Sequence, residues 1–252
     1  MSTVLTSPPA TDAPVSAATR TAIRTVLFDL DGTLIDSAPD LAGATNEMRV
    51  ARGLPEVPFE DLRPMVGAGA RGMMGIAFKV APTQASFPAL RDEFFDRYEQ
   101  RLLRATHPFD GVEAMLDALR EDGLSWGIVT NKSERFALPL AQGLGWSAHA
   151  AAVVGGDTTP FAKPRPEPLF EAARRAGVAA AACIYVGDDA RDIQAGRAAG
   201  MLTVAVRWGY LGQGEPIEAW GADVVIDTPS QLIDWLRAKN AEARGLKSGS
   251  LA

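Results

Sequence analysis

Two aspartates follow directly after a short apolar run in the stretch TVLFDLDGTLIDS at residues 25–37. Such a run is typical of a buried strand, and side chains two residues apart on a strand point the same way. We therefore expect Asp29 and Asp31 to face one space, where their like charges repel unless a divalent cation or a shared proton compensates them. An acidic turn is the alternative, because Asp-Gly is a common turn pair.

The composition suits a folded chain with a sizeable core, as one large domain or as a domain with an insertion. The 252 residues are 47% hydrophobic. A net charge of -6, without any basic stripe, argues against a nucleic-acid partner. No apolar run approaches the roughly 20 residues that cross a bilayer, so no membrane partner is expected. The single cysteine, Cys183, lies in an apolar run, which predicts a core position and favours a reducing, cytoplasmic location.

Both ends of the chain have the composition of tails. Residues 1–22 are rich in Ser, Thr, Ala and Pro and have neither the basic start nor the apolar centre of a secretory signal, so a disordered tail is expected. Arg20 and Arg24 in an acid-poor beginning leave an organellar transit segment as the alternative. Residues 241–252 are expected to form a loose polar tail.

The hydrophobic pattern changes twice along the chain. Residues 40–106 carry apolar residues three and four apart, including 87–103, without a convincing strand. From residue 111 onward, helical patterns alternate with short apolar runs, which is typical of a parallel sheet with helices on both faces. The expected helices are 112–121, 134–144, 167–176, 192–199 and about 230–238, and the expected strands are 126–129, 152–154, 184–186, 202–206 and 224–226.

The simplest organisation is an α/β core domain interrupted by a helical insertion. The core comprises residues 23–39 and 107–240, and the all-helical domain of residues 40–106 would form a lid. A glycine follows each of four expected helices, where a left-handed residue often ends a helix. These glycines are Gly123, Gly145, Gly177 and Gly200.

Polar side chains cluster where the expected strands end. In open parallel sheets, ligands bind beyond the carboxyl ends of the strands, so these side chains are candidates for a site. Simpler alternatives are a polar helix cap, a solvated lysine and acids that complement a helix dipole. The candidates are Asp29, Asp31, Thr130, Asn131, Lys132, Lys163, Asp188, Asp189 and Asp192.

Together these groups suit phosphoryl transfer. Mg²⁺ and an ammonium offset charge on phosphate oxygens, while a carboxylate can attack phosphorus in line. A Walker-type glycine loop is missing from the sequence, which excludes a P-loop. Neither His107 nor His149 stands near the strand ends, so a nucleophile, if there is one, must be an aspartate.

Four motifs, in the order of the family, resemble the haloacid dehalogenase-like (HAD) phosphatases. They are DLDGTLIDS at 29–37, VTNK at 129–132, KPRPEP at 163–168 and VGDDARDIQAGRAAG at 186–200. Over most of residues 24–236 the chain is similar to the phosphoglycolate phosphatase branch. The resemblance implies a Rossmann-like core with a helical cap, acting on a small phosphorylated metabolite, 2-phosphoglycolate, as a monomer or homodimer.

The resemblance also implies roles for the acids. Asp29 would attack the phosphate ester and become an aspartyl phosphate, and Asp31 would protonate the leaving alcohol and then deprotonate the hydrolytic water. Mg²⁺ would be bound by the Asp29 side chain, the Asp31 backbone carbonyl and Asp188, with Asp192 supporting the site. The dehalogenases lack an acid at the second position, so Asp31 favours phosphate over halide.

For the remaining motif residues the resemblance implies phosphate binding. Thr130 and Asn131 would bind phosphate oxygens, and Lys163 would steady the nucleophile and the phosphate. Asp189 departs from the serine of many phosphoglycolate phosphatases; it could alter metal affinity or cap the following helix.

Substrate choice would belong to the lid, whose glycine-rich stretch at 64–73 is expected to be a loop with one cation, Arg71. We expect Arg71, with Lys132, to meet the substrate's carboxylate when the lid closes. The alternative is a surface arginine at a helix start.

Three other functions stay open at this point. N-acetylmuramic acid 6-phosphate phosphatases of cell-wall recycling have a similar cap and fourth motif, here GARGMM and GDDARD. A sugar-phosphate mutase of the same superfamily would return the phosphoryl group to a sugar. A catalytically silent binding module is disfavoured because every motif residue is intact.

Overall fold

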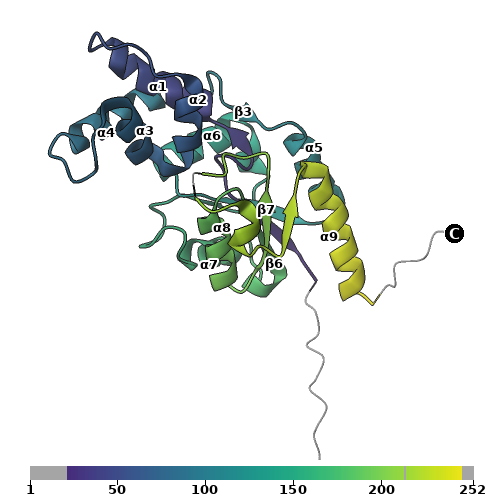
Figure 1. The fold of residues 1–252 in the computed structure, drawn as a ribbon. Coiled ribbons are helices and arrows are strands. Elements are labelled where there is room, and N and C mark those ends of the chain that lie inside the picture. Colours follow the sequence, from purple (N-terminus) through teal and green to yellow (C-terminus); the bar gives the residue numbers. More distant parts are fainter. Residues whose placement is uncertain (1–21, 213, 246–252) are drawn as a thin grey trace, which may run out of the picture.

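The computed structural model describes residues 22–212 and 214–245. Its centre is a six-stranded sheet of order β5-β4-β1-β6-β7-β8 in which every neighbouring pair is parallel, which confirms the predicted α/β class (Figure 1). The strands are β1 (Thr25–Phe28), β4 (Ser125–Val129), β5 (Val153–Val154), β6 (Cys183–Gly187), β7 (Leu202–Val206) and β8 (Val224–Ile226).

Helices cover both faces of the sheet because alternate residues of each strand are buried on opposite sides. Val26 and Phe28 pack in one hydrophobic cluster with α5, α6 and α9, whereas Leu27 packs in another with α7 and α8. The helices are α5 (Val112–Glu121), α6 (Glu134–Gly143), α7 (Glu167–Arg175), α8 (Ala190–Ala198) and α9 (Pro229–Ala243), with short 3₁₀ helices at Trp146–Ala148, Ala180–Ala182 and Ile217–Trp220.

A second group of helices, α1 to α4, which we call the helical segment, lies at one end of the molecule (Figure 1). The chain enters it after β2 (Ile35–Asp36) and leaves it at β3 (His107–Pro108), and these two strands pair antiparallel. Met48, Met73 and Phe94 belong to its hydrophobic cluster. Its elements are α1 (Ala38–Val50), α2 (Phe59–Leu62), the 3₁₀ helix η1 (Arg63–Ala68), α3 (Gly69–Phe78) and α4 (Phe87–Glu99).

Several boundaries differ from the sequence-based expectations. The stretch 64–73 is helical rather than a loop, because η1 and α3 occupy it. The helical pattern up to residue 103 overshoots α4, which ends at Glu99, and Leu103 has a left-handed φ of 64°. Residues 241–243, expected in a loose tail, belong to α9. Residues 1–21 of the expected N-terminal tail at 1–22, and residues 246–252 of the C-terminal tail, lie outside the described residues.

Other local predictions are confirmed. Gly123, Gly145, Gly177 and Gly200 all have φ between 68° and 76°. Cys183 is buried and free, as expected for a small core residue. None of the helices within 22–212 and 214–245 is long and apolar enough to cross a membrane.

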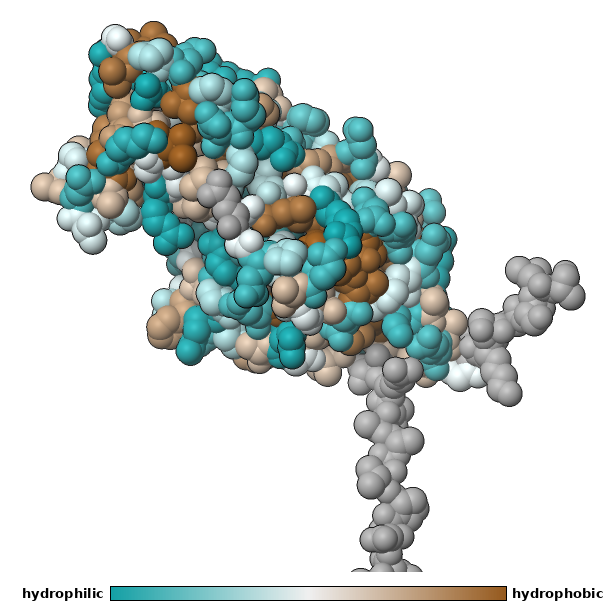
Figure 2. All heavy atoms as spheres, in the orientation of Figure 1, coloured by the Kyte–Doolittle hydropathy of each residue, from teal (hydrophilic) through white to brown (hydrophobic). Residues whose placement is uncertain are grey.

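The surface is mixed in character. Figure 2 shows hydrophobic groups interspersed with hydrophilic ones on this face, both over the sheet and over the helical segment. The exposed large hydrophobic residues of the helical end include Val50, Leu54 and Phe59. Scattered exposed apolar residues of this kind are ordinary on folded proteins.

Candidate active site

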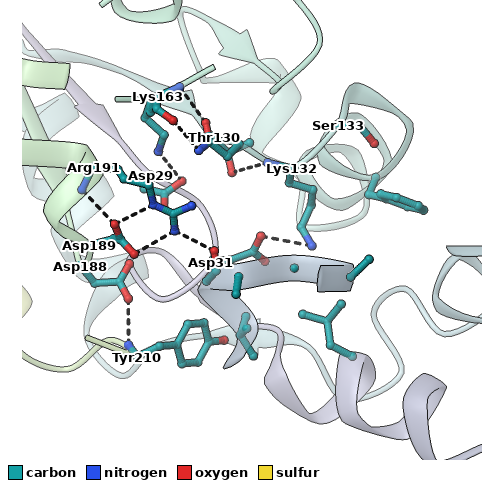
Figure 3. Close-up of a pocket in the computed structure, with 18 of the residues that line it drawn as sticks. Asp29, Asp31, Thr130, Lys132, Ser133, Lys163, Asp188, Asp189, Arg191 and Tyr210 are labelled. Carbon is teal, nitrogen blue, oxygen red and sulfur yellow. Dashed lines mark hydrogen bonds and ion pairs between the residues drawn. The ribbon is translucent and has the colours of Figure 1, made fainter. Parts of the chain in front are cut away.

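A cavity of about 380 Å³ lies between the carboxyl ends of β1, β4 and β6 and the helical segment (Figure 3). The sheet side of the cavity is polar, and the helical side is largely apolar. Nearly all of the predicted site residues line it: Asp29, Asp31, Thr130, Asn131, Lys132, Lys163, Asp188 and Asp192. Arg71 does not line it; this arginine is exposed in the first turn of α3.

The strand β1 delivers Asp29 and Asp31 to this cavity. The N–H of Asp29 donates to the carbonyl of Val186 at 2.9 Å, so the residue after β1 is still held by the sheet. The carboxylate of Asp31 accepts a 2.5 Å hydrogen bond from the Ser37 hydroxyl and pairs with Lys132 Nζ at 3.1 Å. Gly32 then turns the chain with φ 86°, so the acidic pair and the predicted turn coexist.

Lys163 is buried among acceptors rather than solvated. Its three N–H groups are matched by hydrogen bonds to the Val129 carbonyl, the Tyr185 hydroxyl and Asp192 Oδ1, at 3.0, 2.7 and 2.7 Å. Asp29 Oδ1 lies 2.9 Å from the same nitrogen and forms an ion pair with it. Lys163 therefore supports the Asp29 carboxylate by charge attraction.

The charge of Lys163 survives its burial. Burial by itself would lower the pKa of this lysine, but the carboxylates of Asp192 and Asp29 outweigh that effect and raise it. The lysine is therefore an ammonium at neutral pH.

Three carboxylates converge beside this lysine. Asp29, Asp188 and Asp192 each offer an oxygen, and these oxygens lie within 4.8 Å of one another. Burial, followed by the charges of Asp29 and Asp192, raises the pKa of Asp188 well above its ordinary value. Lys163 offsets one of the three negative charges, so the remaining charge and the all-oxygen donor set fit a divalent cation.

Asp188 is held by two hydrogen bonds and by the close approach of two glycines. Its carboxylate accepts hydrogen bonds from the Thr33 hydroxyl at 3.1 Å and from the Tyr210 N–H at 2.8 Å. A Cβ atom at Gly32 or Gly209 would collide with its side chain. The two glycines therefore form a cradle that places the carboxylate at the edge of the cavity.

The other two acids of this motif begin α8. The side chains of Asp189 and Asp192 form a capping box, in which Asp192 Oδ2 accepts from the Asp189 N–H at 3.1 Å. The capping alternative for Asp189 is thus confirmed. Since Asp192 Oδ1 is bound by Lys163, both oxygens of Asp192 already have partners within the protein.

Asn131 and Thr130 lie beside Lys163 in different ways. The Asn131 amide donates to the Lys163 carbonyl and accepts from the Lys163 N–H, both at 2.9 Å, so it fixes the main chain of that lysine. Thr130 Oγ1 accepts from the Lys132 N–H at 3.2 Å and keeps its own proton to donate. Neither residue is the N-cap of α6, which is Ser133.

Three residues of the site were missed by sequence reasoning. Tyr98 of α4 accepts a 2.8 Å hydrogen bond from Lys132 Nζ, and burial raises the pKa of its phenol to about 12. Tyr210 donates through its N–H to Asp188 and accepts through its hydroxyl from the Ser37 N–H at 2.9 Å. Arg191 lines the cavity beside Asp189. Of the three, only Arg191 lies in one of the four motifs, between the candidates Asp189 and Asp192.

The chain is similar to a family of hydrolases and to two kinds of phosphatase. The family model of the haloacid dehalogenase-like hydrolases matches residues 23–200. A phosphoglycolate phosphatase of Xanthomonas campestris pv. campestris is 51% identical over 210 residues, which is 83% of this chain and 94% of that protein. An N-acetylmuramic acid 6-phosphate phosphatase of Pseudomonas aeruginosa is 43% identical over 217 residues, which is 86% and 96% of the two chains.

A solved structure has the same architecture. The crystal structure of a predicted phosphoglycolate phosphatase from Haemophilus somnus superposes with a TM-score of 0.75 at 26% sequence identity, covering 84% of this chain and 97% of that one.

Proposed function

The chain belongs to the haloacid dehalogenase-like hydrolases and is a phosphatase of that family, and we propose that it is a Mg²⁺-dependent enzyme that hydrolyses 2-phosphoglycolate to glycolate and phosphate. The observation that carries this proposal is the cavity in which Asp29, paired with Lys163, lies beside Asp31. The relative that is 51% identical supports the choice of substrate.

Asp29 is the nucleophile in this proposal. Its side chain lines the cavity and is ion-paired with Lys163 at 2.9 Å, which places a carboxylate oxygen for attack on phosphorus. The new bond joins Asp29 to phosphorus as the ester P–O bond breaks, and the leaving alkoxide takes a proton from Asp31. Asp31 then accepts a proton from water, which attacks the aspartyl phosphate and releases inorganic phosphate and the free Asp29 carboxylate.

The acid cluster would hold the metal. The side chains of Asp29 and Asp188 and the backbone carbonyl of Asp31 are the proposed ligands, and Asp192 supports them through its bonds to Lys163 and α8. Bound Mg²⁺ would offset charge on the phosphate oxygens. Within the described residues, no backbone N–H donates to the Asp31 carbonyl, so this oxygen is available.

Phosphate would be bound by the Thr130 hydroxyl, and the charge of the Lys163 ammonium would offset that of the phosphate oxygens. Asn131, whose amide is used on the Lys163 main chain, contributes by holding that lysine in place. We further propose that residues 40–106 form the cap of a core made of residues 23–39 and 107–240. We place the reaction in the cytoplasm, which the free, buried Cys183 supports.

Phosphate release tests the proposal directly. The purified protein is incubated with Mg²⁺ and a panel of phosphometabolites, and inorganic phosphate is measured. We expect 2-phosphoglycolate to give the highest kcat/KM and chelation of Mg²⁺ to stop the reaction. Absence of Mg²⁺-dependent phosphate release from every ester, including an aryl phosphate, would refute the proposal.

A second candidate substrate is N-acetylmuramic acid 6-phosphate. Phe94, Phe95 and Phe136 form an apolar wall of the cavity that 2-phosphoglycolate is too small and polar to use, whereas a sugar with an acetyl group would pack against it. The relative that is 43% identical supports this candidate. Specific activities on the two substrates, measured side by side, separate them. A mutase would instead isomerise a sugar phosphate without releasing phosphate.

A further inference from the structure

Three cationic side chains among the described residues line the cavity, and they differ in how many of their N–H groups are still without an acceptor. Lys163 uses all three N–H groups on Val129, Tyr185 and Asp192. Lys132 is paired with Asp31 and hydrogen-bonded to Tyr98, and its side chain is only 7% exposed. The third cation, Arg191, has a side chain that is 33% exposed.

Arg191 is held in one orientation by its neighbours. Its Nε and Nη2 donate to the two oxygens of Asp189, both at 2.8 Å, and Nη2 also donates to the Gly67 carbonyl at 2.7 Å. Such a bidentate pair fixes the plane of the guanidinium. Among the residues that the structure describes, nothing accepts from Nη1, so its two N–H groups remain for a ligand.

The fixed guanidinium extends from the start of α8 into the cavity (Figure 3). Asp29 is among the charges that raise the pKa of Arg191, after Asp189 and Asp192, so the arginine lies within electrostatic reach of the reacting carboxylate. Lys163 is already committed to its partners beside Asp29, so Arg191 is the better placed of the two cations to bind an anionic group of the substrate.

We propose that Arg191, oriented by Asp189, binds the carboxylate of the substrate and thereby selects phosphomonoesters that carry a carboxylate next to the ester. This inference rests on the proposed phosphatase function and deepens it. A carboxylate suits the site because one of its oxygens can accept a charge-assisted hydrogen bond from the free Nη1. Of the two cations that the sequence suggested for this task, Arg71 does not line the cavity, and Lys132 is paired with Asp31.

A purely structural role for Arg191 makes a different prediction. Its bond to Gly67 connects α8 to η1, so the arginine could simply hold the helical segment against the core. In that case every phosphate ester would lose turnover equally when Arg191 is replaced. Direct binding of the phosphoryl group by Arg191 would have the same consequence.

The experiment compares 2-phosphoglycolate with ethyl phosphate, which has a methyl group in place of the carboxylate. The wild type should prefer 2-phosphoglycolate. In Arg191→Met we expect kcat/KM for 2-phosphoglycolate to fall about 10- to 100-fold, mainly through KM, as for the loss of a charged hydrogen bond. The value for ethyl phosphate should change less than about threefold.

Two further variants control for folding and charge. Arg197→Met removes an exposed arginine from the same helix and should behave as the wild type on both esters. Arg191→Lys keeps the charge without the planar fork and should recover only part of the preference. If Arg191→Met does not fold, the lysine variant and the wild-type preference carry the test.

The outcomes separate the two proposals. An equal loss on both esters in Arg191→Met, or a wild type without preference for 2-phosphoglycolate, overturns the role of Arg191 but leaves the phosphatase proposal intact. A wild type that hydrolyses neither ester nor an aryl phosphate contradicts the proposed function itself.

Discussion

The ammonium of Lys132 lies 3.1 Å from Oδ2 of Asp31, which pairs the cation that follows β4 with the acid that follows β1. The same nitrogen donates to the hydroxyl of Tyr98 in α4. One lysine thus joins the proposed general acid to the helical segment, although the three residues are far apart in the sequence.

Replacing this lysine should affect substrates according to their leaving groups. Among the described residues, Lys132→Met leaves Asp31 with Ser37 as its remaining side-chain partner, so we expect turnover of 2-phosphoglycolate to fall about 10- to 100-fold. An aryl phosphate, whose leaving group needs little protonation, should lose much less. Arg135→Met, which removes an exposed contact between α6 and α4, is the matched control. Equal losses on both substrates would show that Lys132 does not act through the acid.

The two aspartates should give different defects. Asp29→Asn removes the nucleophile and should abolish hydrolysis of every ester, together with any covalent phosphate on the protein. Asp31→Asn should slow alkyl esters by about 10²- to 10⁴-fold and allow an aryl phosphate to load the enzyme. Mass spectrometry of acid-quenched protein detects the phosphorylated form. Near wild-type turnover in Asp29→Asn would contradict the whole mechanism.

Metal binding should be visible in thermal stability as well as in activity. Because Asp188 is buried beside Asp29 and Asp192, its negative charge is costly without a cation. In the presence of a chelator, the Tm of Asp188→Asn should therefore equal or exceed that of the wild type. Added Mg²⁺ should raise the Tm of the wild type and leave that of the variant unchanged. Differential scanning calorimetry with and without Mg²⁺ measures both effects, and an equal Mg²⁺ shift in the two proteins would exclude Asp188 as a ligand.

Cys183 provides a test of the core that does not involve the active site. Burial raises the pKa of this thiol from 9.0 to about 11, so the folded protein favours the protonated form. Its contribution to stability is therefore complete below pH 9 and is lost as the pH rises towards 11. At pH 8 we expect a thiol reagent to label the native protein far more slowly than protein unfolded in urea. Rapid labelling of the native protein would place Cys183 outside the core.

Much of the core could be predicted because its signals are local. Each central strand is a short apolar run, and several strands end in polar residues that the sheet order β4-β1-β6 brings together. Asp29, Thr130 and Asp188 line one cavity as the strand ends suggested. The two-residue strands β2 and β3 are too short to show any periodicity, so their pairing could not be foreseen.

The helical segment was harder to predict because packing decides it. The glycine-rich stretch 64–73 has little intrinsic preference for a helix, yet it becomes helical where Val66, Met73 and Met74 pack in a hydrophobic cluster with α1 and α4. The phase of that helix leaves Arg71 exposed, which no loop prediction could supply. Tyr98 bonds to Lys132, which is 34 positions away in the sequence, and Tyr210 bonds to Ser37, which is 173 positions away. No local sequence pattern indicates contacts of this kind.

Tyr210 links the acid cluster to the point where the chain enters the helical segment. Its N–H holds Asp188, and its hydroxyl accepts from the N–H groups of Ser37 and Ala38, where the chain enters the helical segment. The length of a tyrosine side chain is nearly invariant, so the ring acts as a rigid strut between the acid cluster and this entry point. A displacement of Ser37 relative to Asp188 would therefore strain or break one of these hydrogen bonds.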